Sequence, residues 1–201
     1  MRGLLTDFGG VLTTNVFDSF RAFATAEGLP RDTVKRTFRE NPEALAELRL
    51  LESGQLSVPD FERRFAPHLG IEEHSGLVER LFAGLGPDEP MMEAMRRAHD
   101  AGIKTAVISN SWGDGIYDGV ELGGIFDELV ISGEVGLHKP DPAIFELTCG
   151  RLGVVPSECV FVDDLRENCA AAEELGMTAI LHRGADSTLP ELERLLELRL
   201  R

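Results

Sequence analysis

The chain has 201 residues, of which 43% are hydrophobic and 27% are charged, a composition that excludes a long disordered, collagen-like or coiled-coil protein. Asp and Glu outnumber Lys and Arg by 35 to 20, so the formal net charge of −15 disfavours nucleic acid and anionic membrane surfaces as partners. The length fits one domain, or one domain that carries a sizeable insertion.

The cysteines and the lengths of the apolar runs predict a cytoplasmic location. Three cysteines, an odd number, lie in segments that are typical of a helix, a strand and a helix, which indicates a reducing compartment; they are Cys149, Cys159 and Cys169. The N-terminal apolar run meets Asp7 too early to form the core of a signal peptide. No run approaches the length of a transmembrane helix.

The N-terminal part of the chain predicts one strand followed by a helical insertion. Residues 2–6 form an apolar run that ends abruptly at Asp7, as buried strands do. Residues 15–85 contain no strand-like run. Ser57, which precedes a proline and an acidic residue, is typical of a helix N-cap. Apolar residues within the insertion recur at helical spacing, as at Val16, Phe20 and Phe23.

From residue 86 onward the pattern alternates between helices and strands. Helices are predicted over residues 88–101, from residue 142 onward and over about 189–200. Four further strands are predicted at residues 103–108, 128–131, 159–162 and 178–181. Together with the first strand, they predict an α/β, Rossmann-like fold, in which a parallel sheet of five or more strands carries helices on both faces.

Polar residues follow several of these strands at the point where each strand ends. Asp7 follows the first, Ser109 and Asn110 follow the second, and the pair Asp163-Asp164 follows the fourth. Lys139 lies in the loop between the third and fourth. Because ligands of open parallel sheets bind beyond the carboxyl ends of the strands, we expect these side chains to meet in one crevice.

These segments resemble, in order and spacing, the four motifs of the haloacid dehalogenase superfamily. The likeness extends over nearly the whole chain and is strongest to subfamily IA, in particular to the N-terminal phosphatase domain typical of soluble epoxide hydrolases. It is carried by Ser-Asn-Ser-Trp at 109–112, Gly-Leu-His-Lys-Pro-Asp-Pro-Ala-Ile-Phe at 136–145 and Phe-Val-Asp-Asp-Leu-Arg-Glu-Asn at 161–168. The resemblance implies a catalytic core of residues 1–14 and 86–201 and a helical cap of the C1 type at 15–85. Epoxide chemistry is not implied.

The resemblance also implies a reaction and a set of roles. The reaction is Mg²⁺-dependent hydrolysis of a phosphomonoester, a small phosphorylated metabolite, through an aspartyl phosphate. Asp7 and Lys139 would be catalytic, and Ser109, Asn110, Gly9 and Gly10 would contact the phosphate. Asp7, Asp164 and the backbone carbonyl of Gly9 would bind the metal, with Asp163 behind them.

Elementary chemistry agrees with these implied roles. A carboxylate can attack phosphorus and divide one difficult displacement into two easier steps. A phosphate dianion is repelled by an ionised carboxylate, and by the acidity of this chain, so positive charge must be present at the site. Mg²⁺ on oxygen ligands and the compact ammonium group of Lys139 can supply it.

The chain departs from the family pattern at Gly9. The phosphatases usually carry a second aspartate there, which protonates the leaving group, and a glycine retains only the backbone carbonyl. General acid–base catalysis contributes about 10² to 10⁴ in rate. The departure therefore predicts a preference for good leaving groups, such as those of aryl, acyl or anomeric sugar phosphates.

Three other functions stay open at this stage. A phosphate-ligand binding or regulatory module would keep the metal site without turnover. A haloacid dehalogenase also uses an aspartate nucleophile, but it needs no metal, which would leave Asp163 and Asp164 without a purpose. A phosphonate hydrolase would need a cap lysine, and only Lys35 is available. The oligomeric state, monomer or homodimer, and the identity of the ester cannot be read from the sequence.

Overall fold

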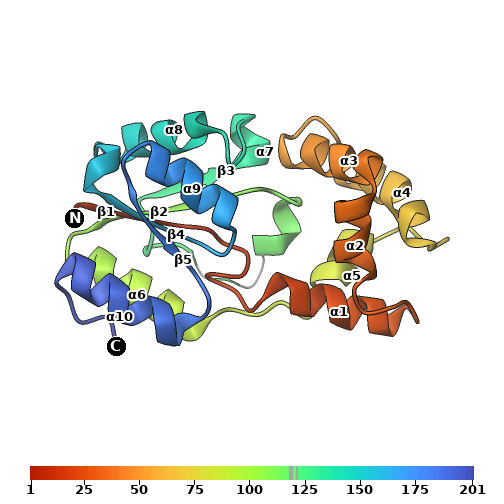
Figure 1. The fold of residues 1–201 in the computed structure, drawn as a ribbon, viewed down its shortest axis with the longest axis horizontal. Helices are drawn as coiled ribbons and strands as arrows, with labels where there is room; N and C mark the ends of the chain where they lie inside the picture. Colours follow the sequence, from red (N-terminus) through yellow and green to blue (C-terminus); the bar gives the residue numbers. More distant parts are fainter. Residues whose placement is uncertain (118–119, 121) are drawn as a thin grey trace.

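The computed structural model describes residues 1–117, 120 and 122–201, and its centre is a five-stranded parallel sheet (Figure 1). The strand order is β3-β2-β1-β4-β5, so the first strand lies in the middle. The strands are β1 (Gly3–Thr6), β2 (Lys104–Ser109), β3 (Glu128–Ile131), β4 (Cys159–Asp163) and β5 (Thr178–Leu181). After β3 the chain crosses back to pair β4 with β1, and this reversal creates the crevice in which ligands of such sheets bind.

Helices cover both faces of the sheet (Figure 1). One face carries α6 (Glu89–Asp100) and α10 (Ala185–Leu196), and the other carries α7 (Ser132–Val135), α8 (Pro142–Leu152) and α9 (Arg166–Glu174). Two short 3₁₀ helices, η1 (Asp114–Tyr117) and η2 (Pro156–Glu158), lie in the connections. The α/β fold with a five-stranded parallel sheet that the sequence predicts is therefore confirmed.

The two faces of the sheet have separate hydrophobic cores, because side chains alternate along each strand. Leu4 of β1 packs with the methionines of α6, and Leu5, the next residue, packs with Phe145 of α8 on the opposite face. Both leucines are fully buried. Strands buried on both faces read as continuous apolar runs, which is why residues 2–6 and 159–162 are recognisable in the sequence.

Five helices between β1 and α6 form a unit at one end of the sheet (Figure 1). They are α1 (Val16–Ala26), α2 (Thr33–Glu40), α3 (Pro42–Glu52), α4 (Val58–Leu69) and α5 (Leu77–Phe82). This unit, called the cap below, has its own core around the fully buried Phe61 and Phe65. The two connections to the sheet domain run side by side, since the N–H of Thr14 donates to the carbonyl of Gly86 at 2.7 Å.

Local capping explains where several helices begin. The Ser57 hydroxyl accepts from the N–H of Asp60, so Ser57 is an N-cap as expected. The Asp88 carboxylate accepts from the N–H of Met91 and caps the helix that is expected to begin at residue 88. The last helix differs from its expected range of 189–200. It begins at Ala185, directly after Gly184, and ends at Leu196, because Glu197 adopts a left-handed conformation with φ 56°.

The observed helix is as long as the expected one but begins and ends four residues earlier; leucines at 189, 192, 196 and 200 suggest the later range. Leu200 is buried, but it follows the helix, and its N–H donates to the Glu193 side chain at 2.9 Å. In the described part of the chain we find no helix with the length and apolar content that crossing a bilayer requires.

Candidate active site

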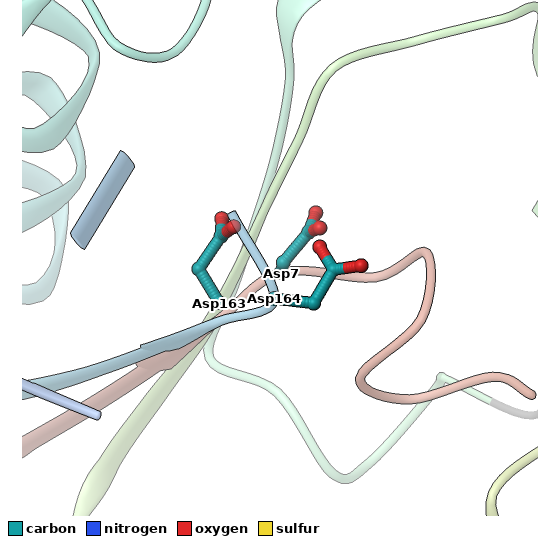
Figure 2. A group of neighbouring side chains, drawn as sticks. All are labelled: Asp7, Asp163 and Asp164. Carbon is teal, nitrogen blue, oxygen red and sulfur yellow. The ribbon is translucent and has the colours of Figure 1, made fainter. Parts of the chain in front are cut away.

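Three aspartates converge at the carboxyl ends of β1 and β4 (Figure 2). The strands pair in register, with Thr6 opposite Val162, so Asp7 and Asp163 extend from neighbouring strands at the same edge. Asp164 follows directly. Each of the three residues offers a carboxylate oxygen within 4.8 Å of those of the others. The topology thus brings together acidic side chains that lie more than 150 positions apart in sequence.

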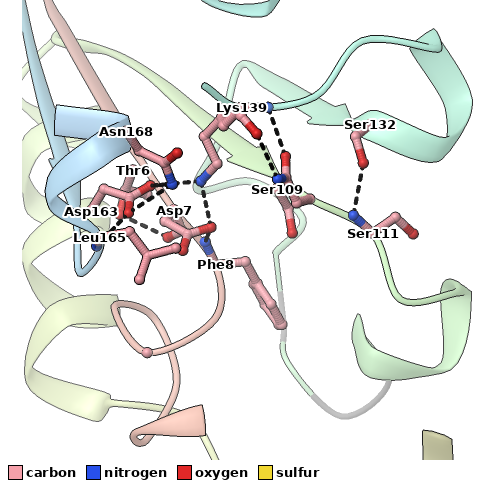
Figure 3. A network of polar contacts seen from close by, with 12 residues as sticks. Thr6, Asp7, Phe8, Ser109, Ser111, Ser132, Lys139, Asp163, Leu165 and Asn168 are labelled. Carbon is pink, nitrogen blue, oxygen red and sulfur yellow. Dashed lines mark hydrogen bonds and ion pairs between the residues drawn. The ribbon is translucent and has the colours of Figure 1, made fainter. Parts of the chain in front are cut away.

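Lys139 is the positive charge of this cluster (Figure 3). Its Nζ lies 2.7 Å from Asp7 Oδ1 and 2.7 Å from Asp163 Oδ2, and its side chain is almost completely buried. Burial alone would lower the pKa of Lys139, but Asp163 and Asp7 raise it above its ordinary value. The ammonium group therefore stays charged, and it holds two of the three carboxylates in place.

Asp163 is enclosed by protein donors. Its Oδ1 accepts from the N–H of Leu165 at 2.8 Å, and both of its oxygens lie within 3.1 Å of Nδ2 of Asn168. With Lys139 on Oδ2, the carboxylate is occupied on both sides (Figure 3). Asp163 therefore positions Lys139, and Asn168, to which the sequence analysis gives no role, positions Asp163. Its position in the sequence could have indicated this role, because Asn168 lies in the first turn of α9, close to the end of β4.

The carboxyl groups of Asp7 and Asp164 have pKa values well above those of ordinary aspartates. The pKa of Asp7 is raised to about 7, mainly by burial and also by Asp163 and Asp164, while Lys139 acts in the opposite direction. Burial and the neighbouring Asp163 raise the pKa of Asp164 to about 6. Three acids around one ammonium group leave an excess of negative charge that a divalent cation with a preference for oxygen would relieve.

Gly10 provides the space for the Asp164 side chain. A Cβ at position 10 would lie 2.9 Å from Asp164 Oδ2, and the φ of +77° is one that side chains rarely adopt. The N–H of Gly10 donates to the hydroxyl of Thr13 at 2.9 Å, and the expected phosphate contact of Gly10 stays a prediction. Gly9 lines the active-site cavity and has an ordinary φ; a Cβ there would meet only a methyl group of Val16 at 3.2 Å.

Ser109 and Asn110 differ in what they can offer a phosphate. The Ser109 hydroxyl accepts from Tyr117 at 2.9 Å and retains its own proton for a ligand. Burial raises the pKa of Tyr117 to about 12, so the tyrosine remains a donor. The Asn110 side chain is committed to the backbone of Lys139, accepting from its N–H at 2.8 Å and donating to its carbonyl at 3.0 Å. In the structure the Asn110 side chain therefore positions Lys139, and the expected phosphate contact of Asn110 stays a prediction.

The aspartates and Lys139 open into a cavity of about 220 Å³ between the sheet and the cap. Asp7, Gly9, Ser109, Asn110, Lys139 and Asp164 line its polar end. The cap contributes six apolar side chains to the opposite wall, namely Val16, Phe17, Phe20, Phe38, Leu48 and Phe82. Trp112 joins this wall and packs against Phe20 at 5.8 Å between ring centroids. One end of the cavity is therefore ionic. The opposite wall, formed by the six cap side chains and Trp112, is apolar and mostly aromatic.

The cap also places one acidic side chain in this cavity, Glu52 at the end of α3. Burial raises the pKa of its carboxyl to about 7, Lys139 lowers it and Asp7 raises it. Glu52 is not among the site residues predicted from the sequence. It is the last residue of an amphipathic helix, and no local pattern marks it apart from the other glutamates of the cap.

A family model described as haloacid dehalogenase-like hydrolase matches residues 1–176. Bifunctional epoxide hydrolase 2 of Mus musculus is 30% identical over 94% of this chain, and the chain spans 37% of that protein's length. Glyceraldehyde 3-phosphate phosphatase of Methanopyrus kandleri is 33% identical over 51% of the chain and 46% of that protein. A third relative, (S)-2-haloacid dehalogenase 4A of Burkholderia cepacia, is 26% identical over 55% of the chain and 50% of that protein.

Solved structures share the fold over almost the full length. A HAD-like hydrolase from Porphyromonas gingivalis has a TM-score of 0.73 at 22% identity and covers 99% of both chains. A HAD family enzyme from Bacteroides thetaiotaomicron, solved in complex with magnesium and inorganic phosphate, has a TM-score of 0.67 at 19% identity. It covers 92% of this chain and 95% of its own.

The glycine pair permits a matched test of the acidic cluster. We expect Gly10→Ala to destabilise the protein by about 1–2 kcal/mol, because alanine is strained at this φ, and to displace the Asp164 carboxylate. Thermal unfolding should show a Tm lower by about 2–8 °C and a smaller rise in Tm on adding Mg²⁺. Gly9→Ala is the control, since its φ is ordinary. Equal Mg²⁺ responses of the two variants would contradict the role given to position 10.

Because the three aspartates repel one another, we expect Asp164→Asn to increase the stability of the folded protein, by an amount that depends on pH. The folded-state pKa of Asp164 is about 6 against an ordinary 3.8, so the folded state binds more protons and its stability falls as pH rises between these values. Above pH 6–7 Asp164 is ionised in the folded state as well, and the loss of stability no longer grows. Allowing for solvent screening, the variant should gain about 1 kcal/mol at pH 8 in chelator, or ~2–4 °C in Tm, and less at pH 5. With excess Mg²⁺ the wild type should become the more stable protein. A gain that does not change with pH would show that repulsion is not the cause.

Proposed function

Because the chain belongs to the haloacid dehalogenase-like hydrolases, we propose that it is a Mg²⁺-dependent phosphomonoester hydrolase that acts on a small phosphorylated metabolite. The observation that carries the proposal is the arrangement at the strand ends. A buried ammonium group lies 2.7 Å from Asp7, and Asp163 and Asp164 complete an acidic cluster beside it. Such a cluster matches phosphate chemistry, in which anionic oxygens must be brought to an anionic nucleophile.

Asp7 acts as the nucleophile. Its Oδ1 accepts from the N–H of Phe8 at 2.7 Å and pairs with Lys139, while Oδ2 is used by neither contact. Oδ2 attacks phosphorus as the bond to the leaving oxygen breaks, which forms an aspartyl phosphate. Attack by water on phosphorus then releases inorganic phosphate and returns the electron pair to Asp7.

Positive charge and directed donors stabilise the transferred phosphoryl group. Lys139 offers a point charge that Asn110 and Asp163 hold in position. The Ser109 hydroxyl can donate to a phosphoryl oxygen, since Tyr117 already satisfies it as an acceptor. Mg²⁺, held by Asp7, Asp164 and the carbonyl of Gly9, would neutralise charge on the phosphate and keep the aspartates ionised.

The cavity favours an apolar leaving group. The cap wall is aromatic and aliphatic, and it would leave the hydroxyl groups of a sugar without partners. A volume of about 220 Å³ suits a group about as large as one aromatic ring. Among the good leaving groups expected from Gly9, aryl phosphates therefore fit better than anomeric sugar phosphates or acyl phosphates of polar acids.

Two alternatives are less well supported by the geometry. Phosphonate hydrolysis would require a cap lysine in the cavity, but Lys35 is exposed and lies over the Phe17 ring at 4.8 Å. Among the described residues that line the cavity, Lys139 is the only lysine. Dehalogenation needs no cation, and it gives the cluster of three carboxylates no task.

We expect Asp7→Asn to abolish Mg²⁺-dependent release of phosphate. The amide cannot form the covalent intermediate, so turnover should fall by at least about 10³-fold. A phosphate-release assay on p-nitrophenyl phosphate, with Mg²⁺ and with chelator, measures this. Activity that survives either the substitution or the chelator would contradict the mechanism. A protein that binds phosphate in a Mg²⁺-dependent way but never releases it from an ester would be a binding module instead.

A second prediction concerns the ester. The value of kcat/KM should be at least about tenfold higher for p-nitrophenyl phosphate than for glycerol phosphate or glucose 1-phosphate. The aryl ester has both an apolar group for the aromatic wall and a weakly basic leaving oxygen, which departs more readily whether or not an acid protonates it. A steady-state comparison of the three esters at one Mg²⁺ concentration tests it. Equal values for the aryl ester and glycerol phosphate would count against both reasons.

A further inference from the structure

The proposed phosphatase lacks a proton donor at position 9, yet a second acidic group faces the same cavity from the cap. We propose that Glu52 is the general acid and base of the reaction: it protonates the leaving group and then accepts a proton from the attacking water. This inference rests on the proposed function and extends it to a residue outside the four sequence motifs.

The position of Glu52 in the cavity is the first support. Glu52 lines the cavity, and its carboxylate lies 3.5 Å from Nδ2 of Asn110, the residue that holds the backbone of Lys139. Asp7 and Lys139 line the same cavity, so a phosphate on Asp7 would place its leaving group toward the cap wall. A donor carried by that wall approaches the leaving oxygen from the side opposite Asp7.

The backbone of Glu52 is fixed to the sheet domain, which is the second support. The Ser132 hydroxyl at the start of α7 donates to the Glu52 carbonyl and accepts from the N–H of Ser111 at 2.8 Å. Ser111 follows Ser109 and Asn110 directly. The loop after Glu52 also packs closely on this region, because a Cβ on Gly54 would lie 2.5 Å from the carbonyl oxygen of Gly133. Figure 1 shows this end of α3 beside α7.

The charges around Glu52 allow it to exist in both protonation states near neutral pH. Burial raises its pKa to about 7, Lys139 lowers it, Asp7 raises it, and Arg49 and Glu167 make smaller contributions in opposite directions. A carboxyl group that titrates close to the working pH serves both as a donor and as an acceptor of protons.

Glu52 gives up its proton when the aspartyl phosphate forms and regains one when the aspartyl phosphate is hydrolysed. When Asp7 Oδ2 bonds to phosphorus, the bond from phosphorus to the leaving oxygen breaks, and that oxygen takes the proton of the Glu52 carboxyl to leave as a neutral alcohol. The Glu52 carboxylate then removes a proton from water as the water oxygen bonds to phosphorus. The bond to Asp7 breaks, inorganic phosphate departs and Glu52 is again protonated. The sum is hydrolysis of one ester by one water molecule.

The test compares Glu52→Gln with the wild type on two esters of equal ring size. Phenyl phosphate releases a basic phenolate that needs a proton, whereas p-nitrophenyl phosphate releases a stabilised anion. We expect kcat/KM to fall by about 100-fold or more on phenyl phosphate but by less than tenfold on p-nitrophenyl phosphate. On the second ester a burst of one equivalent of p-nitrophenolate should precede slow turnover, because hydrolysis of the intermediate has lost its base.

Two further variants and one stability measurement control the test. Glu43→Gln alters an exposed glutamate on the same helix and should leave both esters unaffected. The Tm of Glu52→Gln should match that of the wild type, because glutamine retains the size and polarity of the side chain. Gly9→Asp restores the usual family acid, and in the Glu52→Gln background it should recover at least tenfold in kcat/KM on phenyl phosphate.

An equal loss on both esters would overturn the assignment, since a merely structural role affects both alike. A rate increase in Glu52→Gln would also overturn it, because Glu52 would then act only as a negative charge that repels phosphate. Failure of the proposed function is recognisable separately. In that case the wild type and Asp7→Asn would release no phosphate from either ester, and the assignment of Glu52 would fall with it.

Discussion

The ion triad of Lys139 with Asp7 and Asp163 is the interaction on which the rest of the site depends. Burying an ammonium group is costly unless charged partners surround it, and here both partners lie at 2.7 Å. Asn110 fixes the lysine backbone, and Asn168 fixes Asp163. These contacts hold the Asp7 carboxylate, the proposed nucleophile, and the Lys139 ammonium group in a fixed geometry. Asp164, beside them, adds charge that the triad does not neutralise.

The cap covers the charged residues at the strand ends with apolar side chains. Its aromatic side chains keep the cavity apolar, and charges interact more strongly where water is excluded. The same burial raises the pKa values of Asp7, Asp164 and Glu52 together. The cap therefore contributes both the apolar wall of the cavity and the burial that raises these pKa values. The hydrogen bond from Ser132 to the backbone of Glu52, together with the one from Ser111 to Ser132, connects the cap to the loop that follows Ser109.

The strand-end residues could be found from the sequence because two simple regularities locate them. Buried parallel strands read as apolar runs, and the residues after such runs meet at one edge. Asp7, Lys139, Asp163 and Asp164 follow from this rule and from the family motifs. Contacts already made within the protein could not be foreseen. Nothing in the sequence shows that Thr13 occupies the N–H of Gly10, or that the backbone of Lys139 occupies the Asn110 side chain.

By itself the amino-acid sequence determined the strands, a few helix starts such as the one after Ser57, the acidic residues at the strand ends and the missing side chain at position 9. Local periodicity and capping chemistry depend on residues that are neighbours in the sequence. Only the tertiary structure decided what those residues face. Glu52 meets Asn110 across 58 positions of sequence, and Leu200 is buried although it follows the end of the last helix. Periodicity shows which side of an element is buried, but the partner on that side depends on how distant elements pack.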